Sequence, residues 1–348
     1  MNSAKSSSNT RQYQICARCV MDTSDPDIVF DVNGICNHCT SFLHRLESRG
    51  YVKGTSEANW HTYVDVIKAH GKGKRYDCIV GISGGVDSCY TAHLCKEHGL
   101  RALLIHLDNG WDTEIAVNNI KSVAHALEFD YISYVLDWKE FREIQLAFLR
   151  SSSVDLEMTT DIAILASIYE TAVRHDIKYI ISGGNLASEG ILPTQWGYHG
   201  YKDMKMYNHI VSKYSKVPIT SVPTIGLLKE SYYRFICKIK TLYILNYTDF
   251  DKDTAKQYLI DNLNWKDYGG KHHESKITAF WQGYVMYAKY NMDYRRSTFA
   301  SQICKGQVSR EEALVGLIEK PYDIKKIDED KKYIAKNLVS ALPSWKIT

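Results

Sequence analysis

One short segment constrains the fold of this chain more than any other. Residues 76–82 form an apolar run, residues 83–88 read Ser-Gly-Gly-Val-Asp-Ser, and a helical pattern covers residues 89–98. A strand, a glycine turn and a helix start in this order make a phosphate cradle, because glycines let backbone N–H groups approach an anion and the helix end adds free donors and a positive dipole. The predicted phosphate-binding residues are Ser83, Gly84, Gly85, Asp87 and Ser88.

The spacing of this loop differs from that of two common nucleotide-binding loops. It has neither the lysine of a Walker A loop nor the G-x-G-x-x-G spacing. A simple glycine–serine turn capped by Asp87 is the alternative interpretation, and the strand before the loop and the helix after it argue against that alternative.

Strand and helix patterns alternate after this loop. We expect strands at 76–82, 102–107, 131–136 and 179–184, with helices at 89–98, 113–127, 138–149 and 161–175. This alternation predicts an α/β fold with a doubly wound parallel sheet, whose ligands bind outside the carboxyl ends of the strands. Beyond residue 223 we expect helices, at 229–245, 253–263, 275–290, 310–318 and 328–338.

Length and composition indicate a globular protein of about two domains. We divide the 348 residues into a disordered tail (1–12), a zinc-ribbon module (13–58), a nucleotide-binding domain (59–225) and a helical carboxyl-terminal region (226–348). The net charge of +3 gives no support for a nucleic-acid partner. No apolar run has the length of a secretory signal or a membrane span, so we expect a cytoplasmic protein without membrane contact.

Four of the nine cysteines have metal-binding spacing. Cys16, Cys19, Cys36 and Cys39 form a C-x2-C-x16-C-x2-C array, and residues 31–34 between the pairs predict a hairpin turn in which Asn33 and Gly34 take positive φ angles. Four thiolates fill a zinc tetrahedron and leave no place for a bound water, so the predicted Zn²⁺ is structural. An iron–sulfur cluster or four buried thiols are the alternatives.

Further candidates follow the later strands. Asp108 closes the second strand, where it is either a ligand of Mg²⁺ or ribose, or a turn residue. Asn185 and Glu189 lie in a glycine-containing loop after the fourth strand and are candidates for acceptor binding. Lys271 follows two glycines and could neutralise phosphate charge, with a solvated loop as the alternative. Arg296, beside a second arginine, is a candidate ligand for phosphate or carboxylate, or an ordinary surface residue.

The order of motifs carries a resemblance. Ser-Gly-Gly-Val-Asp-Ser resembles the loop of the ATP pyrophosphatases (PP-loop, HUP-like fold). Four further motifs are Cys-Ala-Arg-Cys-Val-Met-Asp-Thr from Cys16, Leu-Asp-Asn-Gly-Trp ending at Trp111, Tyr-Gly-Gly-Lys-His-His-Glu-Ser ending at Ser275, and Ser-Arg-Glu-Glu-Ala from Ser309. With these, the chain resembles the N-acetyl sugar amidotransferases of bacterial surface-polysaccharide biosynthesis, including those of lipopolysaccharide O-antigen.

This resemblance implies a reaction and its components. ATP adenylates the oxygen of an acetamido group on a nucleotide-activated sugar, ammonia attacks the imidate carbon, and an acetamidino group forms as AMP leaves; pyrophosphate is released in the first step. The resemblance implies Mg²⁺ held in part by Asp161, which with Asp87 and Lys271 makes up the expected catalytic set. It also implies a separate glutaminase subunit as the source of ammonia, since no glutaminase motif is visible in this chain.

Two other functions remain open at this point. A tRNA sulfurtransferase of the same superfamily also combines this loop with paired cysteines, although Cys237 and Cys304 are isolated in the sequence. The second open function is a binding scaffold with a zinc ribbon whose nucleotide-binding domain has lost catalysis. The intact loop of residues 83–88 argues against this second function.

Overall fold

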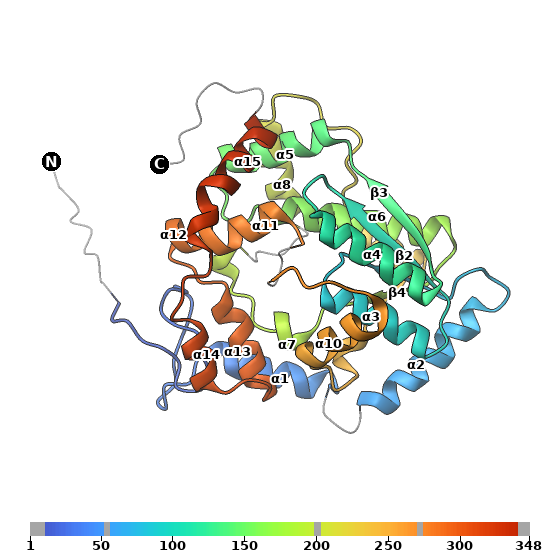
Figure 1. Cartoon of the computed structure of the whole chain (residues 1–348), viewed down its shortest axis with the longest axis horizontal. Coiled ribbons are helices and arrows are strands. Elements are labelled where there is room, and N and C mark those ends of the chain that lie inside the picture. Colours follow the sequence, from blue (N-terminus) through green and yellow to red (C-terminus); the bar gives the residue numbers. More distant parts are fainter. Residues whose placement is uncertain (1–10, 52–55, 198–202, 270–273, 340–348) are drawn as a thin grey trace.

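The centre of the molecule is a parallel sheet of five strands, seen here in a computed structural model (Figure 1) that describes residues 11–51, 56–197, 203–269 and 274–339. The strand order is β3-β2-β1-β4-β5. The strands are β1 (Cys78–Gly81), β2 (Ala102–Asp108), β3 (Asp130–Val135), β4 (Tyr179–Ser182) and β5 (Lys240–Tyr243). In the register, Ile79 of β1 lies between Leu103 of β2 and Ile180 of β4.

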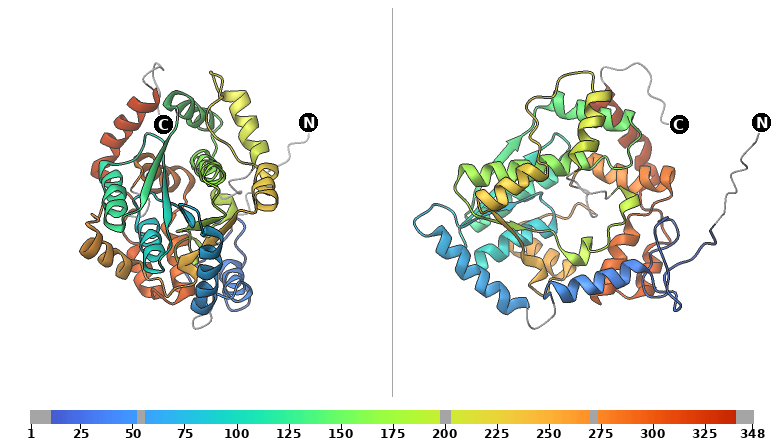
Figure 2. Two further views of the ribbon diagram at one scale, coloured as in Figure 1. Left: turned by 90° about the vertical axis from the view of Figure 1, so that its right-hand side faces the viewer. Right: turned by 180° about the vertical axis from the view of Figure 1, so that it is seen from behind.

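Helices cover both faces of this sheet. One face packs against α2 (Ser56–Gly71), α3 (Val86–Glu97), α4 (Glu114–Leu127) and α10 (Lys252–Leu263). The other face packs against α6 (Met158–Arg174) and the helical segment formed by α9 (Leu227–Ser231) and η2 (Tyr232–Ile236). The left view of Figure 2 places α4 and α6 on opposite sides of the strands. Burial on both faces explains why the inner strands are continuously apolar, and the predicted doubly wound sheet is confirmed.

One strand contradicts the sequence prediction. We expected a helix over 229–245, but the helical segment ends at Ile236 and residues 240–243 form β5 on the edge of the sheet. Lys238 follows the helix in a left-handed conformation at φ 58°, and residues 240–243 after it pair with β4. Lys238 and Lys240 interrupt the apolar pattern that would indicate a strand in the sequence. An edge strand tolerates such lysines, because part of it is exposed to solvent.

The rest of the carboxyl-terminal region is helical, as predicted. Its helices are α11 (Lys276–Phe280), η4 (Trp281–Val285), α12 (Met286–Tyr290), α13 (Arg295–Lys305), α14 (Arg310–Gly316), η5 (Ile324–Lys326) and α15 (Ile327–Val339). The remaining helices are α1 (Asn37–Ser48), α5 (Trp138–Arg150), α7 (Leu186–Glu189), η1 (Thr194–Trp196), α8 (Met204–Tyr214) and η3 (Ile244–Asn246). Within the described residues no helix combines the length and apolar character needed to cross a bilayer.

The amino-terminal cysteine module packs against this carboxyl-terminal region. Its turn is the predicted hairpin, in which Gly34 N donates to Asp31 O at 2.9 Å. Only Gly34 has a positive φ, at 75°, so the expected positive φ of Asn33 was wrong. Helix α1 lies beside α13, and Figure 1 shows both next to α14. The module and the last third of the chain therefore share one core, which also contains Phe42 of α1 and Ala300 of α13.

Candidate functional site

A cavity of about 550 Å³ opens at the carboxyl ends of the strands, within the size range of small-molecule sites. Strand β1 continues to β2 on one side of the sheet, whereas β4 continues to β5 on the other, so the order reverses between β1 and β4. Ligands of doubly wound sheets bind at this reversal point. The loops after both strands line the cavity, and so do the end of β2, the start of α6 and the segment leading into α11.

The loop after β1 holds its shape through its own hydroxyl groups. Ser83 N donates to Ser88 Oγ at 3.1 Å, Gly85 N donates to Ser83 Oγ at 3.3 Å, and Ser88 Oγ donates to Gly85 O at 3.1 Å. Gly85 begins α3 without any side-chain cap. The N–H groups of the first turn and the positive end of the helix dipole are therefore available to an anion in the cavity.

Gly84 fixes the position of this loop against α4. Its φ is 83°, and a Cβ atom built there would lie 2.5 Å from the carbonyl oxygen of Ala116. Its own carbonyl accepts a hydrogen bond from Trp265 Nε1 at 2.8 Å. Gly84 is thus required for packing, whereas Ser83, Gly85, Asp87 and Ser88 line the cavity itself.

Asp87 presents one oxygen to the protein and leaves the other without a partner. Its Oδ2 accepts hydrogen bonds from Asn185 Nδ2 at 3.2 Å and from Ser188 Oγ at 3.3 Å. Its Oδ1 is buried and has no hydrogen-bond partner among the described residues. A carboxylate held in this way is oriented by the loop after β4 and keeps one oxygen for a ligand.

The cavity wall also contains a buried imidazole close to a carboxylate. His106 of β2 is 4% exposed, its Nδ1 lies 3.1 Å from Ile82 O, and its Nε2 lies 3.3 Å from Asp112 Oδ2. Although His106 Nε2 and Asp112 Oδ2 are this close, neither atom makes a hydrogen bond of good geometry to the part of the chain that is described. Burial alone would lower the pKa of His106, but the Asp112 carboxylate and the Ile82 carbonyl stabilise the imidazolium, and the pKa is raised.

Further carboxylates gather on the same cavity. Its acidic lining residues, besides Asp87 and Asp112, are Glu157, Asp161, Glu189 and Glu274. Burial raises the pKa of Glu157 to about 8, and the charge of Asp161 adds to the rise although Thr278 Oγ1 donates to Glu157 Oε2 at 3.1 Å. The pKa of Asp161 is raised by the same enclosure and by Asp155, but its side chain is exposed to water in the cavity, which screens the effect. Clustered carboxylate oxygens are the ligands that Mg²⁺ prefers.

The carboxyl-terminal region closes one side of the cavity. Thr113 N donates to Glu274 O at 2.9 Å, and Asp112 pairs with Ser275 in an antiparallel bridge. Tyr268 OH donates to Glu274 Oε2 at 3.3 Å, and both side chains line the cavity. Tyr268 therefore lies beside the phosphate loop, and Glu274 and Ser275 are bound to the chain just beyond β2.

The structure brings together some of the predicted residues and separates others. Asp161 and Glu189 line the cavity beside Asp87. Asn185 lies behind Asp87 and caps α7, so it positions the carboxylate and does not line the cavity. Asp108 could be a ligand or a turn residue, and its position supports the turn residue. Its Oδ1 accepts a hydrogen bond from Gly110 N at 3.0 Å, and the residue does not line the cavity. Lys271 lies outside the described residues.

Arg296 lies away from the cavity, at the cysteine module. Its Nε lies 3.1 Å from Asp22 Oδ2, and its Nη1 donates to Val20 O at 2.6 Å. We expected Arg296 to bind a phosphate or carboxylate group of the substrate. In the structure it does not line the cavity, and the carboxylate that it binds is that of Asp22. The neighbouring Tyr294, which the sequence analysis did not single out, does line the cavity.

The four predicted metal-binding cysteines do meet. Their sulfur atoms all lie within 4.8 Å of one another, and all four residues are buried. Sγ–Sγ distances are 3.9 Å between Cys16 and Cys39 and 3.7 Å between Cys19 and Cys36. These match the edge of about 3.8 Å of a tetrahedron with metal–sulfur bonds of about 2.3 Å. The cluster therefore has the donors and the size of a site for one metal ion.

Residues far along the chain support this cluster. Arg310 Nε lies 3.2 Å from Cys16 O and 3.1 Å from Cys19 O, and its Nη2 lies 3.1 Å from Cys16 O. Cys304 Sγ lies 3.6 Å from Cys39 Sγ, although Cys304 is isolated in the sequence. Ser301 Oγ, on the same helix as Cys304, accepts a hydrogen bond from Ile191 N at 2.9 Å. Through α13 the cysteine module is thus linked to the segment that follows Glu189, the last residue of α7.

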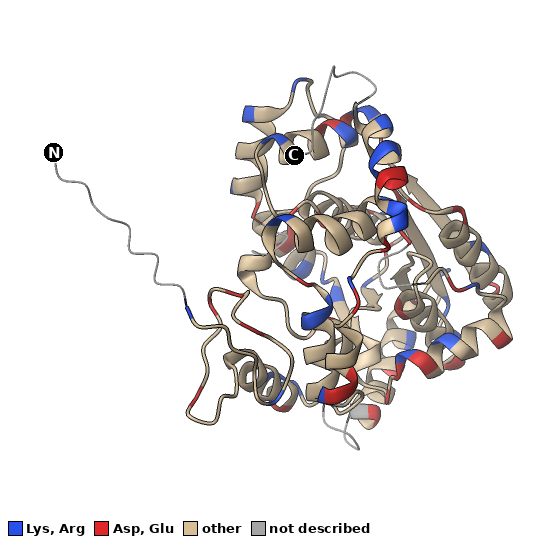
Figure 3. Ribbon diagram, turned by 60° about the vertical axis from the view of Figure 1, so that its left-hand side comes forward, with Lys and Arg blue, Asp and Glu red and all other residues tan. Residues whose placement is uncertain are grey.

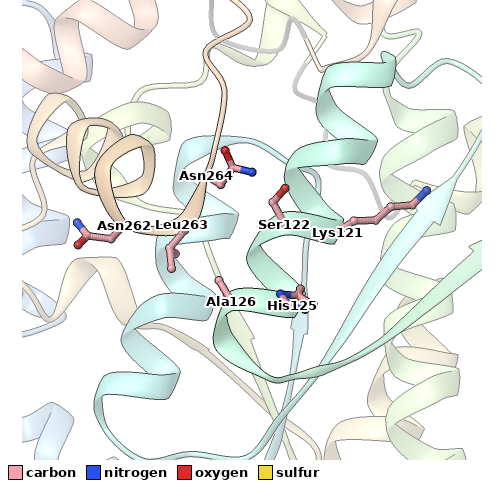
Figure 4. A pocket seen from close by; sticks show the side chains of 7 residues that line it. All are labelled: Lys121, Ser122, His125, Ala126, Asn262, Leu263 and Asn264. Atoms are coloured by element: carbon pink, nitrogen blue, oxygen red, sulfur yellow. The ribbon is translucent and has the colours of Figure 1, made fainter.

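A second hollow lies on the outside of the molecule, between α4 and the end of α10 (Figure 4). It is lined by Lys121, Ser122, His125, Ala126, Asn262, Leu263 and Asn264. The figure shows Lys121 extending away from Asn264. None of its polar side chains is among the buried groups without a partner, so the cavity at the strand ends is the better candidate for chemistry.

Comparison with known families concerns the last part of the chain. Residues 274–341 match the family described as LPS biosynthesis protein WbpG-like, C-terminal domain. The matched residues include Glu274 and Thr278 of the cavity wall together with Arg296, Cys304 and Arg310, which contact the cysteine module.

More distant similarities extend over most of the chain. An uncharacterised protein of Methanocaldococcus jannaschii is 23% identical over 322 residues, which are 90% of this chain and 96% of that protein. The U34-tRNA thiolase NcsA of Methanococcus maripaludis, solved with its [4Fe-4S] cluster, has a TM-score of 0.36 at 13% identity and covers 91% of this chain and 96% of its own. The NH3-dependent NAD synthetase of Campylobacter jejuni has a TM-score of 0.30 at 17% identity, with coverages of 82% and 96%. Similarities at this level do not assign a function.

Proposed function

We propose that this protein is an ATP-dependent amidotransferase of surface-glycan biosynthesis, which converts an acetamido group of a nucleotide-activated sugar to an acetamidino group. The main observation behind the proposal is that the phosphate loop and the WbpG-like domain line the same cavity. The phosphate loop of residues 83–88 forms one wall, and the WbpG-like domain forms another through Glu274, Ser275 and Thr278. Both reactants would meet at the reversal point of the sheet.

The reaction has two balanced steps. The amide oxygen of the sugar attacks the α-phosphorus of ATP, its bond to that phosphorus forms, and pyrophosphate leaves. Ammonia then attacks the imidate carbon, the bond from carbon to the adenylate oxygen breaks, and AMP leaves with the former amide oxygen. The ammonium-like intermediate loses protons in the second step, so a base must lie near the acyl carbon.

The described residues divide these tasks. The N–H groups at the start of α3 bind the departing pyrophosphate, and Asn185 and Ser188 hold Asp87 in its orientation. Asp87 and Asp161 would hold Mg²⁺, which when bound neutralises phosphate charge; the unpartnered Oδ1 of Asp87 and the carboxylates around it fit such an ion. Glu157, whose pKa is raised to about 8, lines the same cavity and is the proposed acceptor of a proton from the attacking nitrogen, which it can take only in its ionised form, dominant above about pH 8.

We propose Zn²⁺ for the four-cysteine cluster, with a structural role. The Sγ–Sγ distances of 3.7–3.9 Å fit four thiolates on one ion. An iron–sulfur cluster with four irons would hold its thiolates further apart, because each thiolate binds a different iron. The link from α13 to Ile191 makes the ion a support for the acceptor side of the cavity.

Two further elements belong to the proposal. A separate glutaminase subunit supplies ammonia, and the reaction takes place in the cytoplasm, where ATP and nucleotide sugars are available. Thiolation of tRNA is the weaker alternative, because none of the nine cysteines lines the cavity and a thiolating enzyme needs a sulfur carrier at the reacting carbon.

The test is pyrophosphate release by the purified chain with ATP, Mg²⁺, ammonium and a panel of UDP-linked acetamido sugars. We expect AMP and pyrophosphate in equal amounts with at least one sugar, and no release with the same sugar lacking its acetamido group. Release of ADP and phosphate, or release that does not depend on an acetamido group, would overturn the proposal. Asp108→Asn is a matched control for Asp87→Asn, because Asp108 ends a neighbouring strand but lies outside the cavity lining.

A further inference from the structure

The helical segment of α9 and η2 exposes an apolar face that no described element covers. Its exposed fractions are 69% for Leu227, 90% for Leu228, 53% for Tyr232, 73% for Phe235 and 69% for Ile236. Leu228, Tyr232 and Phe235 follow helical spacing and lie on one side. A cluster of large apolar side chains this exposed marks an interaction surface.

The opposite face of the same segment is firmly packed. Tyr233 is 6% exposed and stacks on Tyr169 of α6, with ring centroids 5.1 Å apart and planes inclined by 8°. Lys229 Nζ donates to Glu170 Oε1 of α6 at 2.8 Å. The right view of Figure 2 shows the segment lying along α6 on the outside of the sheet. The apolar face is therefore presented to solvent by a fixed helix.

The charges within this segment are mostly positive, although Lys229 is paired with Glu170 of α6. Residues 227–240 contain Lys229, Arg234, Lys238 and Lys240 against Glu230, a net charge of +3, which equals the net charge of the whole chain. Arg234 lies 3.6 Å from Glu230, whereas Lys238 and Lys240 are exposed and form no ion pair with any described residue. Elsewhere, on the face seen in Figure 3, basic and acidic residues are interspersed.

From this arrangement we propose that the α9–η2 segment docks on an anionic phospholipid membrane. Leucine, phenylalanine and tyrosine side chains on a short helix with lysine and arginine beside them are the composition of interfacial helices, whose apolar side chains enter the acyl boundary while the cations meet lipid phosphates. A second copy of the chain fits this surface poorly, since self-association would bring the same cations together.

This proposal departs from the expectation, drawn from the sequence, that the protein has no membrane contact. That expectation considered only apolar runs long enough for a signal or a span. In residues 227–240 the apolar residues alternate with charges, and only the fold shows that the apolar ones face outwards while Tyr233 and Ile239 face the core. The proposal is independent of the chemistry in the cavity.

The experiment is flotation of the full-length protein with vesicles. The probes are vesicles of phosphatidylglycerol with phosphatidylethanolamine, and vesicles of phosphatidylcholine alone. We expect binding to the anionic vesicles that falls as salt is raised, and a decrease of about tenfold or more in the partition coefficient for Leu228→Ser with Phe235→Ser, and separately for Lys238→Glu with Lys240→Glu. The catalytic rate without vesicles and the thermal midpoint should not change.

A matched control keeps the test specific. Val315→Ser with Ile318→Ser removes two apolar side chains that are 65% and 80% exposed at the end of α14, and it should leave vesicle binding unchanged. No binding of the unaltered protein to anionic vesicles at low salt would overturn the proposal. An equal loss in the control pair, or a dimer that dissociates on Leu228→Ser in protein that does not bind vesicles, would overturn it as well.

Discussion

Replacing Arg310 by alanine should weaken both the fold and the binding of the metal ion that we propose for the four cysteines. Its guanidinium makes three contacts of 3.1–3.2 Å to the carbonyl oxygens of Cys16 and Cys19, and these two residues are fully buried. Removing the donor leaves two buried acceptors without this partner, at a cost of about 1–3 kcal/mol each. We therefore expect a loss of about 3 kcal/mol in the free energy of unfolding.

This loss converts into a measurable shift. An entropy of unfolding of about 2.1 cal/mol/K per residue gives about 0.7 kcal/mol/K for 348 residues, so the thermal midpoint should fall by about 4 °C. The same variant should release its metal faster to a chromogenic chelator, because the two carbonyls belong to the loop that positions Cys16 and Cys19. The assays are calorimetry of the metal-loaded protein and the rate of metal transfer.

Arg295 provides the control for this prediction. It makes a comparable set of contacts, to Asp293 and to the carbonyl oxygens of Gly316 and Glu319, but none to the cysteine module. Arg295→Ala should lower the thermal midpoint and leave the rate of metal transfer unchanged. An Arg310→Ala protein with an unaltered midpoint and an unaltered rate of metal transfer would refute the reasoning.

Three further substitutions test the cavity. Asp87→Asn should reduce pyrophosphate release by at least about 100-fold with the circular dichroism spectrum unchanged, and a rate near that of the unaltered protein would remove Asp87 from the site. The pKa of Glu157 is about 8 in the folded protein against 4.5 in the unfolded chain, so the folded state binds the proton more tightly and stability falls as pH rises through this interval. Glu157→Gln should hence raise the thermal midpoint more at pH 8 than at pH 5, and an equal shift at both would contradict the raised pKa. Gly84→Ala should lower the free energy of unfolding, measured in urea, by at least about 2 kcal/mol, because Gly84 has a positive φ and a Cβ atom there would contact Ala116. Gly306 also has a positive φ but has open space around it, so Gly306→Ala should lower this free energy by about half as much.

The sequence was sufficient where a local pattern fixes the structure. The glycine loop between β1 and α3 and the two cysteine pairs lie as predicted, because strand, turn and helix signals are local and two C-x2-C pairs have few ways to bind one ion. Glu189 lines the cavity, as its place after the fourth strand suggested, because parallel strands end at one edge of the sheet. Asp161 lines it too, but only the family resemblance pointed to that residue.

Long-range contacts could not be predicted in the same way. His106 and Asp112 have no distinguishing pattern in the sequence, and only the fold brings His106 Nε2 to 3.3 Å from Asp112 Oδ2 in the wall of the cavity. Alternation within β2 would have indicated which face His106 occupies, but not what lies opposite. Arg296 was assigned to a substrate because adjacent arginines suit anions, yet the anion it meets is Asp22, which is distant in the sequence.

The transfer of the amide oxygen tests the central claim most directly. An acetamido sugar labelled with ¹⁸O in its carbonyl group is converted in the presence of ATP, Mg²⁺ and ammonium, and the AMP is analysed by mass spectrometry. If the amide oxygen attacks the α-phosphorus in the cavity at the reversal point of the sheet, the label appears in the phosphate of AMP, one atom for each acetamidino group formed. Unlabelled AMP, with the ¹⁸O retained in the sugar or lost to water, would contradict the account.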